Sequence, residues 1–174
     1  MVTEETLCRV RRRTDEDIEA CVRALADVHR HDGYPLDWPA RPADWLRGDS
    51  VLGAWVGELD GRPVAHVTLS TAAEDDLAPA AWSERTGAAR DATAVLGRLF
   101  VAPRARSHRL GARLIAEATA EARRRALHPV LDVVASDTSA VALYERLGWH
   151  RLTTVRQQWG RGRTVTLHCY AAPA

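Results

Sequence analysis

The chain has 174 residues, of which 46% are hydrophobic and 27% are charged. That length and composition are typical of one soluble globular domain, so we expect a single domain over residues 1–174 and neither a disordered nor a fibrous chain. The formal net charge is +1, from 24 arginines without any lysine against 23 acidic residues. A strongly basic surface for nucleic acids is therefore not expected.

Two further features bear on where the protein resides. The sequence has no run of about 18 apolar residues, the length that a membrane-spanning helix requires, and its acidic start over residues 1–5 lacks the apolar stretch of a signal peptide. The three cysteines, Cys8, Cys21 and Cys169, are odd in number, far apart and without a CxxC pair. We expect reduced thiols in a cytoplasmic protein that does not bind a membrane.

Hydrophobic periodicity and turn residues predict the elements of the first half in chain order. They are a strand over 6–12, a helix from 14 to 33, a loop rich in proline and aromatic residues over 34–42, a short helix over 42–47, and strands over 51–59 and 63–70. Asp60-Gly61 joins the last two strands and is a strong signal for a two-residue hairpin.

The second half continues with alternating strands and helices. The predicted elements are a loop over 71–92 with a helical turn around 80–85, a strand over 93–101, a helix over 110–126, a strand over 130–135, a helix over 139–147, and strands over 150–158 and 164–170. Gly148 ends the last helix, and Gly160-Arg-Gly162 makes the last turn. This order is typical of a mixed α/β sheet.

The segment 99–115 carries the strongest functional signal, because it reads as strand, turn and helix. The turn and the start of the helix combine basic and small residues: Arg104, Arg106, Ser107, His108, Arg109, Leu110, Gly111 and Ala112. The first turn of a helix exposes unpaired N–H groups and partial positive charge, and small residues let a pyrophosphate approach them. A solvated basic turn ahead of an amphipathic helix is the alternative interpretation.

This segment resembles the acyl-CoA signature of the GNAT superfamily of N-acetyltransferases. In that family a strand ends in Leu-aromatic-Val and is followed by x-Pro-x-x-Arg-x-x-Gly-x-Gly/Ala at the start of a helix. The matching residues here are Leu99, Phe100, Val101, Pro103, Arg106 and Gly111. Arg109 stands where the first glycine usually lies, which implies a backbone conformation that does without glycine. Its guanidinium then either lies near a phosphate or crowds the loop.

A second match lies downstream. Residues 134–149 resemble the family's strand followed by Asn-x-x-Ala-x-x-Leu-Tyr-x-x-x-Gly-Phe, with Asp137 in place of the Asn and Trp149 in place of the Phe. Aspartate caps a helix as well as asparagine does. Tyr144 falls on the family position that points at the sulfur of CoA, whereas a packed aromatic on a helix face is the alternative. The resemblance covers residues 50–170.

The resemblance implies a GNAT-like fold and a reaction. The fold is a mixed, mostly antiparallel central sheet with splayed central strands, flanked by helices. The reaction is acetyl-CoA-dependent N-acetylation of a primary amine, which attacks the thioester directly. By position, backbone groups of Leu99, Phe100 and Val101 bind the pantetheine arm and polarise the thioester. Residues 106–112 and Asp137 complete the cofactor site, and Tyr144 protonates the departing thiolate.

The general base is less clearly marked, because the strand over 93–98 offers no carboxylate. The candidates are His66, His31, Asp32, Glu74, Asp75, Asp76 and Asp91. We take His66 as the catalytic candidate, although a lone strand histidine is often a hydrogen-bonded structural residue. Water is the remaining route for the proton.

The acceptor site is expected around Tyr34, Trp38 and Trp45, where aromatic walls and nearby carboxylates suit a cationic amine. The alternative is that these residues seal the edge of the core. A small-molecule amine is the leading acceptor. A protein N-terminus or lysine, and a non-catalytic acyl-CoA-binding module, are the alternatives. We expect no metal, and the resemblance allows a homodimer formed through the final strands.

Overall fold

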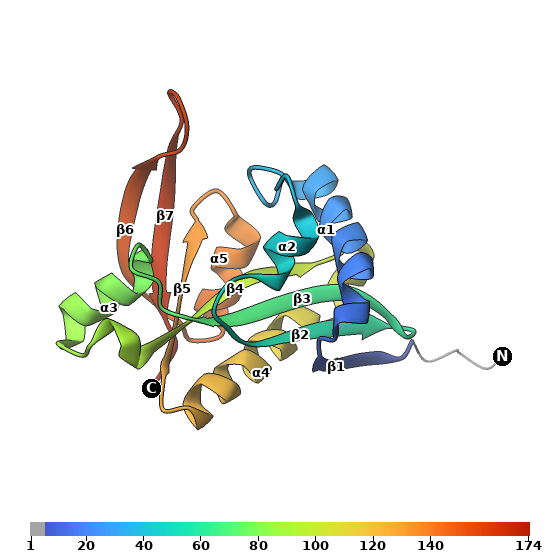
Figure 1. Ribbon diagram of the computed structural model, residues 1–174, viewed down its shortest axis with the longest axis horizontal. Coiled ribbons are helices and arrows are strands. Elements are labelled where there is room, and N and C mark those ends of the chain that lie inside the picture. The colour runs from blue at the N-terminus through green and yellow to red at the C-terminus, as the bar shows by residue number, and fades with distance from the viewer. Residues whose placement is uncertain (1–5) are drawn as a thin grey trace. The chain divides into compact units, whose positions relative to one another are not determined.

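The computed structural model describes residues 6–174. The acidic start over residues 1–5, which argued against a signal peptide, lies outside them. The chain forms a seven-stranded sheet in the order β1-β2-β3-β4-β5-β7-β6 (Figure 1). β2 is antiparallel to β1, and β7 is antiparallel to both β5 and β6, whereas β4 and β5 are parallel. The mixed, mostly antiparallel sheet that the sequence predicted is therefore confirmed.

The fold divides into two compact units. The first contains the chain up to Leu69 together with Arg98–Ala118, and the second contains Ser70–Gly97 and Thr119–Ala174. Strand β4 (Thr93–Val101) passes from the second unit into the first. It pairs with β5 (His128–Val134) through its first three residues, Thr93–Val95. The residues Leu99–Val101 lie beyond that pairing.

The first unit holds the elements on either side of the predicted loop over 34–42. They are β1 (Cys8–Arg12), η1 (Asp15–Asp17), α1 (Ile18–Asp32), α2 (Pro42–Arg47), β2 (Val51–Leu59), most of β3 (Arg62–Thr71), η3 (Pro103–His108) and the start of α4 (Leu110–Arg124). Asp60 and Gly61 both have positive φ, 51° and 79°, as the predicted hairpin turn requires. α1 and α2 pack against each other.

Helix α4 approaches the sheet closely at one point. A Cβ atom on Gly57 of β2 would lie 3.0 Å from Leu110 Cδ2 and 3.0 Å from the Cβ of Ala65. Leu110 and Leu114 are buried, which places the predicted apolar face of α4 in the core. Glycine at residue 57 therefore allows the first residue of α4 to pack directly on the sheet.

The second unit contains the remaining elements. They are α3 (Leu77–Thr86), η2 (Arg90–Ala92), the first part of β4, β5, α5 (Thr138–Arg146), β6 (His150–Gln158) and β7 (Thr164–Ala171). α3 is longer than the helical turn predicted around 80–85. Ala78 of α3 is buried in a cluster with Val130 and Leu152, and Trp82 packs against it. This packing stabilises a helix that local sequence signals did not reveal.

None of the helices within residues 6–174 combines the length and the apolar composition needed to cross a bilayer.

Candidate active site

The predicted cofactor segment folds as strand, 3-10 helix and α-helix, all in the first unit from Arg98 onward. The N–H of Ala102 donates to the carbonyl of Val64 on β3 at 2.8 Å, and the N–H of Ala105 donates to the carbonyl of Ala102 at 2.9 Å. These bonds fix the exit from β4. The basic turn is thus an ordered 3-10 helix, η3, which is followed by the N-terminus of α4. The backbone N–H groups at that N-terminus lack intrahelical acceptors.

Arg109 joins η3 to α4 in a left-handed conformation, with φ 56° and ψ 25°. This differs from the expectation of a conformation that does without glycine, because glycine favours this region and a side chain is strained in it. The loop therefore keeps the geometry that the family's glycine allows. Arg109 is exposed, and its guanidinium has no hydrogen bond or ion pair within the described part of the chain.

The other arginines of η3 are paired with α1. Arg104 Nη1 lies 3.1 Å from Asp27 Oδ2, and Arg106 forms an ion pair with Asp32. The hydrogen bond from Arg106 is the main reason why the pKa of Asp32 is lowered, and His31 adds to it through Nδ1, 2.6 Å from Asp32 Oδ1. Two base candidates, His31 and Asp32, are thus engaged with each other and with the loop.

His66 on β3 is completely buried and both of its ring nitrogens are hydrogen-bonded. Nδ1 lies 2.9 Å from the carbonyl oxygen of Arg98, and Nε2 lies 2.9 Å from Nη1 of Arg13. Because a carbonyl only accepts and a guanidinium only donates, Nδ1 carries the proton and Nε2 accepts. Burial, with the charges of Arg13 and Arg98, lowers the pKa of His66 to about 4. This neutral ring has no free lone pair for a proton from an amine.

The aromatic residues predicted for the acceptor form two contacts. Tyr34 meets Trp45 edge-on, with ring centroids 6.4 Å apart, and Trp38, 40% exposed, meets His29 of α1 at 5.3 Å. The guanidinium of Arg98 lies over the ring of Trp45, 4.1 Å from its centroid. The sequence did not predict this contact of Arg98, because the residue pattern of a strand does not indicate that a side chain on it reaches α2.

Tyr144 lies on α5 in the second unit. Its side chain is buried, with its ring centroid 5.9 Å from that of Trp149 and 6.2 Å from that of Tyr170. Asp137 Oδ1 accepts from the N–H of Ala140 at 3.2 Å, which is the predicted helix cap. The remaining base candidates, Glu74, Asp75, Asp76 and Asp91, also belong to the second unit and lie in the segments that flank α3.

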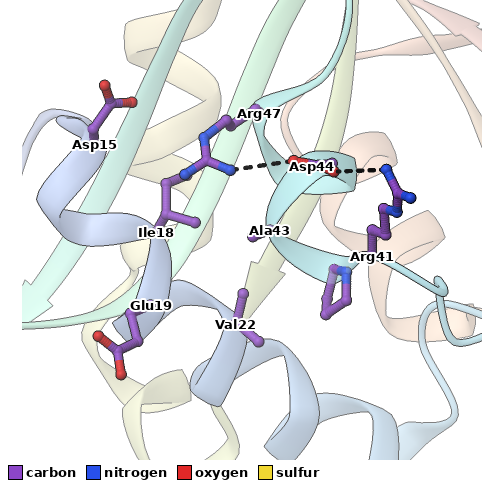
Figure 2. A pocket seen from close by; sticks show the side chains of 9 residues that line it. Asp15, Ile18, Glu19, Val22, Arg41, Ala43, Asp44 and Arg47 are labelled. Carbon is purple, nitrogen blue, oxygen red and sulfur yellow. Dashed lines mark hydrogen bonds and ion pairs between the residues drawn. The ribbon is translucent and has the colours of Figure 1, made fainter.

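A pocket that the sequence did not predict opens between α1 and α2, with a volume of about 420 Å³ (Figure 2). Ile18, Val22 and Ala43 supply apolar lining, while Asp44 pairs with Arg47 and Arg41 at its edge. Neither Tyr34, Trp38 nor Trp45 lines it. The pocket and the predicted acceptor residues are therefore different parts of the first unit.

β4, η3 and α4 follow one another as the acyl-CoA signature predicted, and α5 has its predicted cap. A comparison of the sequence with family models identifies the family. The model of the acetyltransferase (GNAT) family matches residues 18–149. The chain belongs to this family. The GNAT protein is therefore an acyltransferase, and the match covers η3, the start of α4, and Tyr144.

Solved structures share the GNAT fold. A ribosomal-protein-alanine N-acetyltransferase from Brucella melitensis is 21% identical, with a TM-score of 0.71 over 95% of this chain and 99% of that one. The yncA protein of Salmonella typhimurium, solved with its cofactor acetyl-CoA, is 18% identical, with a TM-score of 0.67 over 94% and 92%. NAA60 of Arabidopsis thaliana, in complex with acetyl-CoA, is 15% identical, with a TM-score of 0.70 over 95% and 97%. A search of curated protein sequences finds no match.

Proposed function

We propose that this GNAT protein transfers the acetyl group of acetyl-CoA to the primary amine of a small molecule. The observation that carries the proposal is the junction of η3 and α4, where the guanidinium of Arg109, without a partner among residues 6–174, precedes a helix N-terminus. Backbone N–H groups and an unpaired arginine suit a pyrophosphate. Acetyl-CoA in the structures of yncA and NAA60 supports it as the acyl donor.

Each part of the junction has a role in binding. Backbone groups of Leu99, Phe100 and Val101, beyond the pairing of β4 with β5, bind the pantetheine arm. The residues Arg106, Ser107, His108, Arg109, Leu110, Gly111 and Ala112 surround the pyrophosphate. Asp137 holds the start of α5 through its cap, which orients the helix that carries Tyr144. Bound acetyl-CoA supplies an activated thioester carbonyl.

The transfer forms a bond from the amine nitrogen to the carbonyl carbon and breaks the bond from that carbon to sulfur. The phenol of Tyr144 gives its proton to the departing thiolate. The proton of the amine goes to water, because the lone pair of His66 Nε2 is already occupied by Arg13. A neutral amine then reacts without a protein base, and proximity accounts for much of the acceleration.

Replacement of Tyr144 by Phe tests the proton donor. We expect kcat to fall by about two orders of magnitude, because loss of a general acid removes its share of the acceleration, while binding of acetyl-CoA persists. Tyr170→Phe is the matched control, since it removes another tyrosine hydroxyl of the second unit, one that bonds Glu145. Turnover of Tyr144→Phe at the wild-type rate would refute the assigned role.

Tyr34, Trp38 and Trp45 are the proposed acceptor residues, and a small molecule is favoured because they supply flat aromatic surface in one segment. The likeness in fold to a ribosomal-protein-alanine N-acetyltransferase makes a protein N-terminus the second candidate. A panel of small amines, amino acids and peptides with N-terminal alanine, with release of CoA thiol as the readout, separates the two.

The experiment that comes first is thermal unfolding with acetyl-CoA, desulfo-CoA and a nicotinamide dinucleotide. A ligand that binds only the folded state raises the midpoint of unfolding. We expect a rise with both CoA compounds and none with the dinucleotide. A rise without turnover on any amine or peptide favours a non-catalytic acyl-CoA-binding module, and no rise at millimolar acetyl-CoA contradicts the proposal.

We also propose that residues 1–174 form a single functional domain, that the protein is located in the cytoplasm, and that it forms a homodimer through β6 and β7.

A further inference from the structure

We propose that His66 is a positioning residue, which holds residue 98 in the conformation that sets the course of Leu99–Val101. The inference rests on the proposed function, because those three residues are taken to bind the pantetheine arm. It assigns His66 a role that differs from the general base considered from the sequence.

A closed ring of contacts surrounds His66. Arg13 Nη1 donates to the carbonyl of Leu46 at 2.6 Å and to Nε2 of His66 at 2.9 Å. Nδ1 of His66 donates to the carbonyl of Arg98 at 2.9 Å, and Arg98 returns to α2 by stacking on Trp45, with Nε 3.4 Å from the carbonyl of Trp45. We call these five residues the His66 ring. It ties the end of α2 to β3 and β4 within the first unit.

The residue that this ring holds is strained. Arg98 has φ 53°, in the left-handed region that is costly for a residue with a Cβ atom. Such a conformation persists where the surroundings impose it. The hydrogen bond from the buried N–H of His66 imposes this conformation, because it fixes the direction of the carbonyl at residue 98.

His66 also contacts β4 two residues further along. The ring of Phe100 stacks on the imidazole, with centroids 5.4 Å apart and planes 20° from parallel. One imidazole thus holds residue 98 by a hydrogen bond and residue 100 by stacking, on either side of Leu99. The peptide groups between them are those proposed to meet the pantetheine arm, so a shift of His66 moves them directly.

The test compares His66→Asn with His66→Leu. The amide nitrogen of Asn reaches the position of Nδ1 and keeps a donor for the carbonyl of Arg98, whereas Leu removes it. We expect His66→Leu to weaken acetyl-CoA binding by at least about tenfold, since a buried carbonyl loses its donor, and His66→Asn to restore most of the affinity. Both should keep the shape of the wild-type pH profile of kcat/KM. The control is His128→Gln, a histidine of the second unit that bonds the carbonyl of Ala172.

The result that would overturn the proposal is specific. A general base predicts that His66→Asn binds acetyl-CoA as the wild type does, loses turnover, and lacks an ionisation that the wild-type pH profile shows. Wild-type affinity in His66→Leu also overturns it. If the wild type itself fails to bind acetyl-CoA, the proposed function fails, and the next measurement still decides the role of His66.

That measurement is a double-mutant cycle on stability with Arg98→Gly. Glycine takes a left-handed conformation without steric cost. The hydrogen bond from His66 Nδ1 to the carbonyl of residue 98 is then less important for keeping residue 98 in that conformation. We expect His66→Leu to lower the midpoint of unfolding less in the Arg98→Gly background than in the wild type. Equal losses in the two backgrounds mean that His66 does not hold residue 98, and they contradict the proposal without any ligand.

Discussion

The imidazole of His66 titrates far from its ordinary range, because burial lowers its pKa from 6.5 to about 4. The charged groups that face it are the guanidinium groups of Arg13 and Arg98. The unfolded chain takes up a proton near pH 6.5 that the folded protein takes up only near pH 4. The stability that the neutral ring contributes is therefore complete above pH 6.5 and is lost as the pH falls toward 4.

We expect this loss to reach about 3 kcal/mol, at about 1.4 kcal/mol for each pKa unit. Urea unfolding of the wild type and of His66→Asn at several pH values measures it. The carboxylates contribute equally to both proteins, so the difference between the two curves isolates His66. Parallel curves from pH 6.5 to 4 would show that the ring is not buried in its neutral form.

At Arg109 the backbone conformation favours glycine, whereas the proposed binding of phosphate favours the arginine side chain. Its left-handed conformation is strained, but its guanidinium precedes the proposed pyrophosphate site. We expect Arg109→Gly to raise the stability of the free protein by up to about 1 kcal/mol, because glycine relieves the strain. The same change should weaken acetyl-CoA binding several-fold. Arg109→Asn, which tolerates this conformation without a charge, is the control; tighter binding in both variants would mean that Arg109 crowds the loop.

At the scale of elements, α1 holds η3 through two carboxylates. Arg106 forms an ion pair with Asp32, so in the proposed function Asp32 competes with the anionic cosubstrate for this guanidinium. We expect Asp32→Asn to tighten acetyl-CoA binding by a few fold, a modest change because this ion pair is partly exposed and screened by water. Isothermal titration of the variant beside Asp91→Asn, an exposed carboxylate of η2, measures it. Weaker binding in Asp32→Asn alone would show that the ion pair organises the loop rather than competing with the ligand.

The elements that the sequence predicted well are those with strong stop signals. Gly48 ends α2 and Pro103 ends β4 where the pattern placed them, because these residues limit the backbone locally. Only a helical turn around 80–85 was predicted where α3 spans Leu77–Thr86, since the full helix depends on packing of Ala78 and Trp82 against distant strands. The turn proposed to bind the cofactor was predicted from its residues and their spacing, and it is the 3-10 helix η3. The His66 ring was not predicted, because it joins Arg13 and three separate elements, α2, β3 and β4, through a backbone conformation at residue 98 that arginine does not signal.

At the scale of the whole molecule, opposite charges nearly cancel. The net charge is +1, and three of the arginines that could meet an anion, Arg104, Arg106 and Arg11, are already in ion pairs. Long-range attraction of acetyl-CoA by the protein as a whole is therefore weak. Electrostatic binding has to come from groups within a few ångströms of the phosphates.

If the phosphates are bound by such nearby charges, the affinity for acetyl-CoA depends on the salt concentration. Raising the ionic strength from about 0.1 to about 1 M shortens the screening length from about 10 to about 3 Å, so exposed contacts of arginine with phosphate weaken. We expect the affinity for acetyl-CoA to fall several-fold over this range, while pantetheine, which lacks the phosphates, binds equally well throughout. Arg109→Asn should flatten the response to salt for acetyl-CoA. If both ligands respond alike, the phosphates do not meet the loop charges, and the junction of η3 and α4 is not where the pyrophosphate binds.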